Sequence, residues 1–356
     1  MIKPLSVLSL MLMLLMLASC GKSSKTAGPD STSSQAAVGL TGAGSTFIYP
    51  IASKWFSEYK KLHPDVQVNY QSIGSGGGIK QVTEGTVDFG ATDGPMNDQQ
   101  LADFKTKRGC DILHLPAALG AVVPTYNIPE VTTELNFTPE VLAGIFLGKI
   151  KMWNDAAIAA ANPGVKLPAK EIVVAHRSDG SGTTYVWVDY LSKVSADWKA
   201  KVGVGTSVNW PVGLGGKGNE GVMGLVKQTP YSIGYVELIY SIQNKILYGK
   251  VKNASGNFVK ADLASVTGAA SAAASTMPAD FRVSITNPTG PDAYPISSFT
   301  WFMIPSKIAD AKKREEIVGF LNWMLADGQS FNEPLDYAKL PSAVIEMEKK
   351  AVATIH

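Results

Sequence analysis

Glycines and hydroxyl side chains cluster at three places where a strand is expected to lead into a helix. The segments are residues 41–47 (TGAGSTF), 74–78 (GSGGG) and 177–184 (RSDGSGTT). Glycine allows close approach to the backbone, and the first turn of a helix leaves N–H groups unpaired. Because Ser and Thr add hydroxyl donors and Arg177 adds positive charge, these segments predict an anion site helped by helix dipoles.

Each segment alone is also typical of an ordinary capped helix start, since Ser and Thr are common N-cap residues. Three similar segments, one of them with an arginine, favour a shared oxyanion site. Residues 213–218 formally match G-x-G-x-x-G, but Trp210 and Pro211 precede them and no clear strand–helix–strand unit surrounds them, so a dinucleotide site is not favoured.

The usual signatures of catalytic chemistry do not occur in the sequence. Neither Ser75 nor Ser181 lies in G-x-S-x-G, and the 4 histidines are scattered without metal-ligand spacing. These patterns do not exclude a catalytic triad whose members are distant in sequence and meet only in the folded chain. We therefore expect no catalytic residue, no metal and no cofactor.

Hydrophobic periodicity indicates the elements that must position these segments. Helices are predicted around Ile51, Trp55, Tyr59 and Leu62; Ile79 and Val82; Trp187, Tyr190, Leu191 and Val194; and Ile317, Phe320, Leu321 and Met324. Strands are predicted at Val66, Val68 and Tyr70, at Val87 and Phe89, and at residues 172–174. Strands that alternate with helices predict α/β lobes with mostly parallel sheets.

The composition limits the class of protein. A chain of 356 residues is long enough for two lobes, and its 45% hydrophobic content excludes a disordered or collagen-like protein. The formal net charge is only +2, which argues against nucleic acid as a partner. An anion must therefore be bound by a local site.

The N-terminus predicts export and a lipid anchor. Lys3 precedes an apolar run from Leu5 to Leu17, which ends in the sequence LASC at Cys20. This run has the length of a signal peptide and is short for a membrane span. We expect a signal peptide over residues 1–19 and a lipidated Cys20; an ordinary secretory signal with an incidental cysteine is the alternative.

A flexible tether is expected between the anchor and the folded body. Residues 20–38 are rich in Ser, Thr, Gly and Lys and lack apolar periodicity. The chain has 2 cysteines, too few for a disulfide framework. Cys110 is expected to be a small buried hydrophobe.

The motifs resemble those of the phosphate-binding proteins of phosphate-specific ABC transporters. The matching segments are residues 42–47 (GAGSTF), 73–78 (IGSGGG), 87–93 (VDFGATD), 147–150 (LGKI), 177–183 (RSDGSGT), 213–219 (GLGGKGN), 232–237 (SIGYVE) and 335–338 (LDYA). They run from about residue 39 to about 350 in the order of the family. The chain departs from the family pattern at two places. The lipoprotein motif LASC, residues 17–20, replaces the plain secretory signal of soluble members, and Ile48 stands where the family has proline.

This resemblance implies a two-lobed periplasmic-binding-protein fold, type II-like, that closes on phosphate in a hinge cleft. Lobe one is expected at residues 39–119 plus 301–356, and lobe two at residues 120–300. The ligand residues implied by the matching motifs are Thr46, Phe47, Ser75, Asp93, Arg177, Ser181, Gly182 and Thr183. Asp179 is expected to orient and partly neutralise Arg177, and Asp93 to accept a phosphate proton, although its local sequence predicts only a turn residue.

The implied function is capture of inorganic phosphate outside the cytoplasmic membrane, in the periplasm or at the cell surface. Delivery to a membrane-embedded ABC permease with its ATPase subunits would follow, without covalent chemistry. The alternatives are a receptor for sulfate, molybdate or arsenate, an extracytoplasmic phosphatase on the same scaffold, and a sensor or surface protein without a permease.

Overall fold

A mixed sheet of eight strands runs through the residues that the computed structural model describes, 37–274 and 277–356. Its order is β2-β1-β3-β11-β4-β8-β6-β7. The strands are β1 (Val38–Gly44), β2 (Val66–Ser72), β3 (Phe89–Thr92), β4 (Ile112–Asn127), β6 (Val173–Arg177), β7 (Leu214–Gly216), β8 (Ser232–Glu237) and β11 (Ser297–Pro305). A smaller sheet holds β10 (Phe258–Val259), β9 (Lys250–Lys252) and β5 (Asn136–Phe137).

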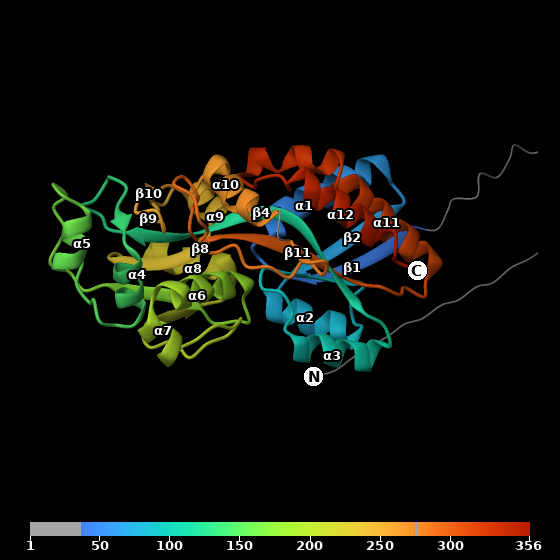
Figure 1. The fold of residues 1–356 in the computed structure, drawn as a ribbon, viewed down its shortest axis with the longest axis horizontal. Coiled ribbons are helices and arrows are strands. Elements are labelled where there is room, and N and C mark those ends of the chain that lie inside the picture. The colour runs from blue at the N-terminus through green and yellow to red at the C-terminus, as the bar shows by residue number, and fades with distance from the viewer. Residues whose placement is uncertain (1–36, 275–276) are drawn as a thin grey trace, which may run out of the picture. The chain divides into compact units, whose positions relative to one another are not determined.

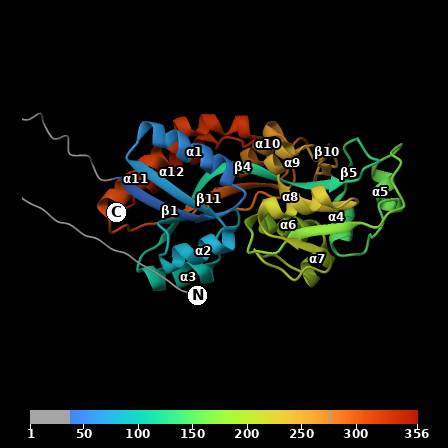
Figure 2. The ribbon, with the colours of Figure 1, turned by 180° about the vertical axis from the view of Figure 1, so that it is seen from behind.

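Helices cover both faces of the large sheet (Figures 1 and 2). Near β1 and β2 these are α1 (Tyr49–Leu62), α11 (Ala311–Met324) and α12 (Ser342–Val352) on one face, with α2 (Ser75–Glu84) and α3 (Asp98–Arg108) on the other. The helices at the opposite end are α4 (Pro139–Phe146), α5 (Ala156–Ala161), α6 (Gly182–Val194), α7 (Ala196–Lys201), α8 (Gly218–Gln228), α9 (Leu238–Asn244) and α10 (Leu263–Ala274). None of the helices described is long and apolar enough to cross a membrane.

The predicted helices and strands are confirmed, with small differences at their ends. In α1 the side chains of Ile51, Trp55 and Tyr59 are buried, whereas Leu62 is 62% exposed. Leu62 is the last residue of the helix, so it extends past the surface that α1 packs against. Strand β3 begins at Phe89, two residues later than the apolar pattern predicts.

The sheet is parallel only towards its two ends. Strand β1 pairs in parallel with β2 and β3, and β6 with β7 and β8. Between these groups β4 and β11 run antiparallel to each other and to their outer neighbours. Thirteen consecutive residues of β4 are buried, and a strand that is buried on both faces shows no alternation of apolar and polar residues.

The two predicted lobe boundaries both fall inside this antiparallel pair. The boundary at 119/120 lies in β4, and the boundary at 300/301 lies in β11. At the second, the pairing register shifts between Thr300 and Trp301. A bulge of this kind bends a strand locally. The division into two lobes stays a prediction, and the paired strands are the segment that a hinge would use.

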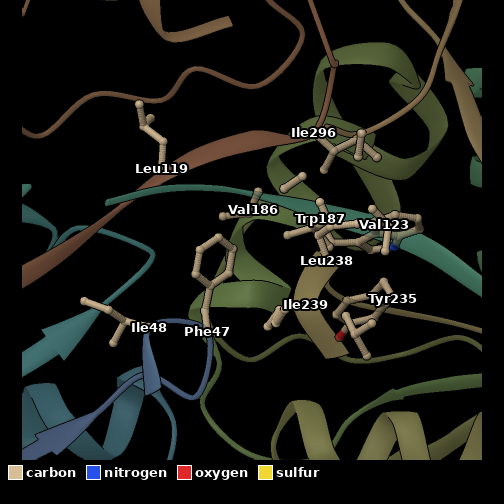
Figure 3. Packing of buried hydrophobic residues seen from close by; sticks show 14 of the residues in the cluster. Phe47, Ile48, Leu119, Val123, Val186, Trp187, Tyr235, Leu238, Ile239 and Ile296 are labelled. Carbon is tan, nitrogen blue, oxygen red and sulfur yellow. The ribbon is translucent and has the colours of Figure 1, made fainter. Parts of the chain in front are cut away.

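Phe47 joins the turn after β1 to the main hydrophobic core. It is fully buried in the same cluster as Leu119, Val186 and Ile239, from β4, α6 and α9 (Figure 3). Cys110, in contrast, is a free cysteine that is only partly buried, at the edge of a second, smaller cluster. The prediction that Cys110 is buried was therefore wrong, because this residue follows the end of α3 at the surface.

We expect Gly120→Ala to destabilise the protein by about 1–3 kcal/mol. A Cβ at this position would lie 2.6 Å from the Phe47 ring and 3.1 Å from Glu237 Oε1, and both groups are fully buried. The measurement is the free energy of unfolding in urea. Gly224→Ala is the control, because its Cβ would meet nothing within 4 Å. If Gly120→Ala lowered the free energy of unfolding no more than Gly224→Ala, the packing described here would be contradicted.

Candidate functional site

The glycine-rich turns from opposite ends of the sheet lie against each other. The Gly76 amide donates to the Gly180 carbonyl at 2.9 Å. A Cβ on Gly76 would come within 3.0 Å of the Gly180 Cα, and a Cβ on Gly182 would come within 2.5 Å of both Asp93 Oδ2 and Ser75 Oγ. Only glycine permits backbones and side chains to approach this closely, and the structure thus brings residues 74–78 and 177–184 side by side.

The start of α6 presents donors at this meeting point. Ser181 is the N-cap and accepts from the Thr184 amide at 3.0 Å, which leaves the hydroxyl proton of Ser181 to donate. The amides of Gly182 and Thr183 have no acceptor among the described residues. Unpaired amides and the positive end of the helix dipole favour an anion at such a position.

Arg177 provides the positive charge, at the end of β6. Its side chain is 1% exposed and makes two hydrogen bonds with Asp179, Nε to Oδ1 at 2.8 Å and Nη2 to Oδ2 at 2.5 Å. Burial acts to raise the pKa of Asp179, but the hydrogen bonds and charge of Arg177 outweigh it and leave this pKa below its ordinary value. The Gly218 amide also donates to Asp179, at 3.0 Å. The two hydrogen bonds hold the Arg177 guanidinium in one plane with the Asp179 carboxylate.

Asp93 is a buried carboxyl group on the other side of the turns. It is 1% exposed, and its Oδ1 accepts from Ser45 Oγ at 2.5 Å and from Thr300 Oγ1 at 2.8 Å. Its own amide donates to Ser75 Oγ at 3.2 Å. Burial raises the pKa of Asp93 to about 6, although the two hydroxyls and the charge of Arg177 act to lower it. Asp93 can thus change its charge close to neutral pH.

Thr46 and Phe47 occupy the turn between β1 and α1. Thr46 Oγ1 accepts from Asn219 Nδ2 at 2.8 Å and from the Asn219 amide at 3.2 Å, so the hydroxyl proton of Thr46 is left to donate. The Phe47 amide donates to Ser45 Oγ at 2.9 Å. An anion at this turn would therefore share the Phe47 amide with Ser45.

Three further residues at the site were missed by sequence reasoning. Asn219 is fully buried and bonds Thr46, Thr183 Oγ1 and, through Oδ1, the Glu237 amide. Ser45 lies within a segment that the sequence singles out. Thr300 has no local signal, because it lies in the continuously buried strand β11.

The glycine-rich residues 213–218, which directly precede Asn219, could have pointed to this residue. The expectation that no clear strand–helix–strand unit surrounds residues 213–218 was wrong, because β7, α8 and β8 follow one another here. Leu214–Gly216 form β7, paired in parallel with β6, and α8 begins at Gly218. This is a fourth strand-to-helix junction, and its first amides bond Asp179 and Thr46.

The arrangement suits a tetrahedral oxyanion that carries a proton. Hydroxyls, helix-start amides and one guanidinium supply donors, while Asp93 is an acceptor when it is ionised. All eight predicted ligand residues contribute an atom to this group of turns or lie beside it. Within residues 37–274 and 277–356, no group of three His, Cys, Asp or Glu is placed to hold a metal ion.

Comparison with known proteins relates the chain to binding proteins. A family model described as a PBP superfamily domain matches residues 29–328. The phosphate-binding protein PstS of Xylella fastidiosa strain Temecula1 is 46% identical, covering 89% of this chain and 86% of the relative. That of Pasteurella multocida is 45% identical, covering 86% and 88%. The solved phosphate-binding protein of Stenotrophomonas maltophilia has a TM-score of 0.67 at 17% identity, covering 88% and 94%; it supports the fold alone.

We expect Asp93→Asn to stabilise the anion-free protein above pH 6, by about 3 kcal/mol. The folded-state pKa of Asp93, about 6, lies above the ordinary value of 3.8, so the folded protein takes up this proton first as the pH falls. Above pH 6 the ionised Asp93 therefore lowers the stability of the folded protein. This loss of stability disappears as the pH falls from 6 to 4, because Asp93 becomes protonated.

The measurement is the difference in free energy of unfolding between the two proteins from pH 4 to 8. His114, whose pKa burial lowers to about 4, titrates in both proteins, so its contribution cancels. A difference that does not change with pH would show that Asp93 has an ordinary pKa.

Proposed function

The chain belongs to the PstS family of phosphate-binding proteins, within the PBP superfamily, and we propose that it captures inorganic phosphate outside the cytoplasmic membrane for delivery to an ABC permease. The observation that carries this proposal is that a buried cation, Arg177, and a buried carboxyl group, Asp93, lie in one group of segments that supply hydroxyl and amide donors. A site of this kind offers both positive charge and one acceptor.

Each predicted ligand residue has a specific part in this proposal. Arg177 attracts and bonds the anion, with Asp179 fixing the plane of its guanidinium. The remaining donors surround the other phosphate oxygens, and they are the hydroxyls of Thr46, Ser75, Ser181 and Thr183 and the amides of Phe47, Gly182 and Thr183. Asp93 accepts the proton that phosphate keeps near neutral pH.

Asp93 would also decide selectivity between oxyanions. Phosphate can point an O–H group at the carboxylate, whereas fully ionised sulfate places an oxygen against it. Two acceptors that meet in a buried site repel each other, and neither has the hydrogen bond that it lost from water. Arsenate keeps a proton and would escape this penalty.

Binding without covalent change is part of the proposal, since the relatives are named as binding proteins. Closure of two lobes, 39–119 plus 301–356 and 120–300, would use β4 and β11 as the hinge, because both predicted boundaries lie in these strands. Hydrolysis of a chromogenic phosphate ester would instead favour the phosphatase alternative.

We expect phosphate to bind at least a thousandfold more tightly than sulfate at pH 8, about 4 kcal/mol, as measured by calorimetric titration of the purified protein. Asp93→Asn should narrow this gap, because an amide can turn a donor towards sulfate. Acidification of the unmodified protein through pH 6, about the pKa of Asp93, should also narrow the difference in affinity between phosphate and sulfate, because a protonated Asp93 can donate to sulfate. Tight sulfate binding at pH 8 would exclude this role for Asp93.

Arg177→Ala should weaken phosphate binding by several kcal/mol, since hydrogen bonds to a buried charge are strong. Lys227→Ala is the control, because Lys227 is an exposed residue in the last turn of α8. Equal affinities for the Arg177→Ala and Lys227→Ala proteins would contradict the proposed site.

We further propose that Cys20 carries a lipid that anchors the protein to a membrane through residues 21–37. The support is the sequence alone, because Cys20 and the predicted signal peptide lie outside the described residues. Cys20→Ala should release the protein from membranes or block its processing, while Cys110→Ala should leave the partition unchanged. The measurement is detergent phase separation; partition of the unmodified protein into the aqueous phase would exclude the anchor.

A further inference from the structure

Four consecutive backbone carbonyls in the turn after β1 are each held by donors from other elements. The Gly44 carbonyl accepts from the amides of Ile73 and Gly74, at 3.0 and 2.8 Å. The next three each accept a tyrosine hydroxyl. Tyr70 donates to Ser45 O at 2.8 Å, Tyr240 to Thr46 O at 2.6 Å and Tyr337 to Phe47 O at 2.5 Å.

The three tyrosines come from distant parts of the chain. Tyr70 belongs to β2, Tyr240 to α9, and Tyr337 to the segment between β11 and α12. Tyr240 and Tyr337 are buried, whereas Tyr70 is partly exposed. The Tyr240 hydroxyl also lies 3.1 Å from Glu220 Oε1, but Thr46 O is nearer, so the single hydroxyl proton goes to the carbonyl.

A carbonyl oxygen that turned towards a bound anion would repel it. Peptide groups rotate as units, so the direction of each carbonyl also sets the direction of the amide on the next residue. The hydrogen bond from Tyr240 to Thr46 O therefore also sets the direction of the Phe47 N–H group. The hydrogen bond from Tyr337 to Phe47 O likewise sets the direction of the Ile48 N–H group. Both amides lie at Ser45 Oγ, at 2.9 and 3.3 Å.

We propose that Tyr240 and Tyr337, with Tyr70 in a smaller role, are positioning residues that hold the carbonyls of Ser45, Thr46 and Phe47 away from the anion. The turn then presents only donors, the Phe47 amide and the Thr46 hydroxyl, to the site. This inference rests on the proposed phosphate binding and assigns a role to three residues that do not touch the ligand.

The surroundings of Tyr337 support the direction of its hydrogen bond. Its hydroxyl also lies 3.4 Å from Glu237 Oε2, and a hydroxyl has a single proton. Burial, with the negative charges of Asp336 and Asp93, raises the pKa of Glu237 well above its ordinary value. Phe47 O lies much nearer to the hydroxyl, at 2.5 Å, so the single proton goes to this carbonyl rather than to Glu237 Oε2.

The experiment compares tyrosine-to-phenylalanine variants, each of which removes one hydroxyl. Tyr294→Phe is the matched control, since Tyr294 is fully buried and donates to another backbone carbonyl, Val122 O, at 3.0 Å. We expect Tyr240→Phe and Tyr337→Phe to weaken phosphate binding about threefold to tenfold, and Tyr70→Phe less. Tyr294→Phe should lower the melting temperature similarly and leave the affinity unchanged.

Nuclear magnetic resonance provides a readout that does not depend on phosphate. The sequence contains one Phe-Ile pair, residues 47 and 48, so ¹³C-carbonyl phenylalanine with ¹⁵N isoleucine gives a single correlated signal. Tyr337→Phe should shift this signal in the anion-free protein, and Tyr294→Phe should not.

Three results would overturn the proposal. These are an unmoved signal in Tyr337→Phe, unchanged affinity in both Tyr240→Phe and Tyr337→Phe, and an equal loss of affinity in Tyr294→Phe. Failure of the unmodified protein to bind phosphate would instead refute the proposed function, and the spectroscopic result would still report whether Tyr337 holds the turn.

Discussion

The close approach of Gly76 and Gly180 is the contact on which the site depends. Their backbones meet through a hydrogen bond of 2.9 Å; Gly76 lies in the first turn of α2 and Gly180 in the loop before α6. A side chain at either position would separate the turns, because an added Cβ would lie 3.0 Å from the Cα of the other glycine. With the turns in contact, Arg177, Ser75 and the start of α6 come into one group. The antiparallel pair of β4 and β11 connects the two ends of the sheet and keeps this contact within reach.

Once the turns meet, water is excluded and the charges must be balanced locally. Arg177 and Asp179 form a pair with two hydrogen bonds, so neither is an isolated buried charge. The Asp93 carboxyl group accepts from the hydroxyls of Ser45 and Thr300 and forms no ion pair among the described residues, so burial raises its pKa to about 6. The site therefore combines a permanent cation with a carboxyl group that titrates near neutral pH, and this combination matches an anion that keeps one proton.

The orientation of the turn between β1 and α1 is set by residues that lie far from it in sequence. Tyr240 and Tyr337 hold two adjacent carbonyls, and Asn219 holds the Thr46 hydroxyl. These side chains are buried, so the cost of leaving any partner without a hydrogen bond is high. Side chains from other elements thus fix the carbonyls and the threonine hydroxyl of the turn between β1 and α1.

Patterns among neighbouring residues predicted the helices, the strands and the donor-rich segments. Local periodicity predicted helices such as α1 and α11, and the cluster of Arg177, Ser181 and Thr183 predicted an anion site, because both are properties of neighbouring residues. Family motifs, rather than local pattern, pointed to Asp93. Only the tertiary structure showed the antiparallel middle of the sheet, the role of Asn219 and the raised pKa of Asp93. Those features depend on which distant segments pack together, since burial and long-range hydrogen bonds leave no periodic trace in the chain.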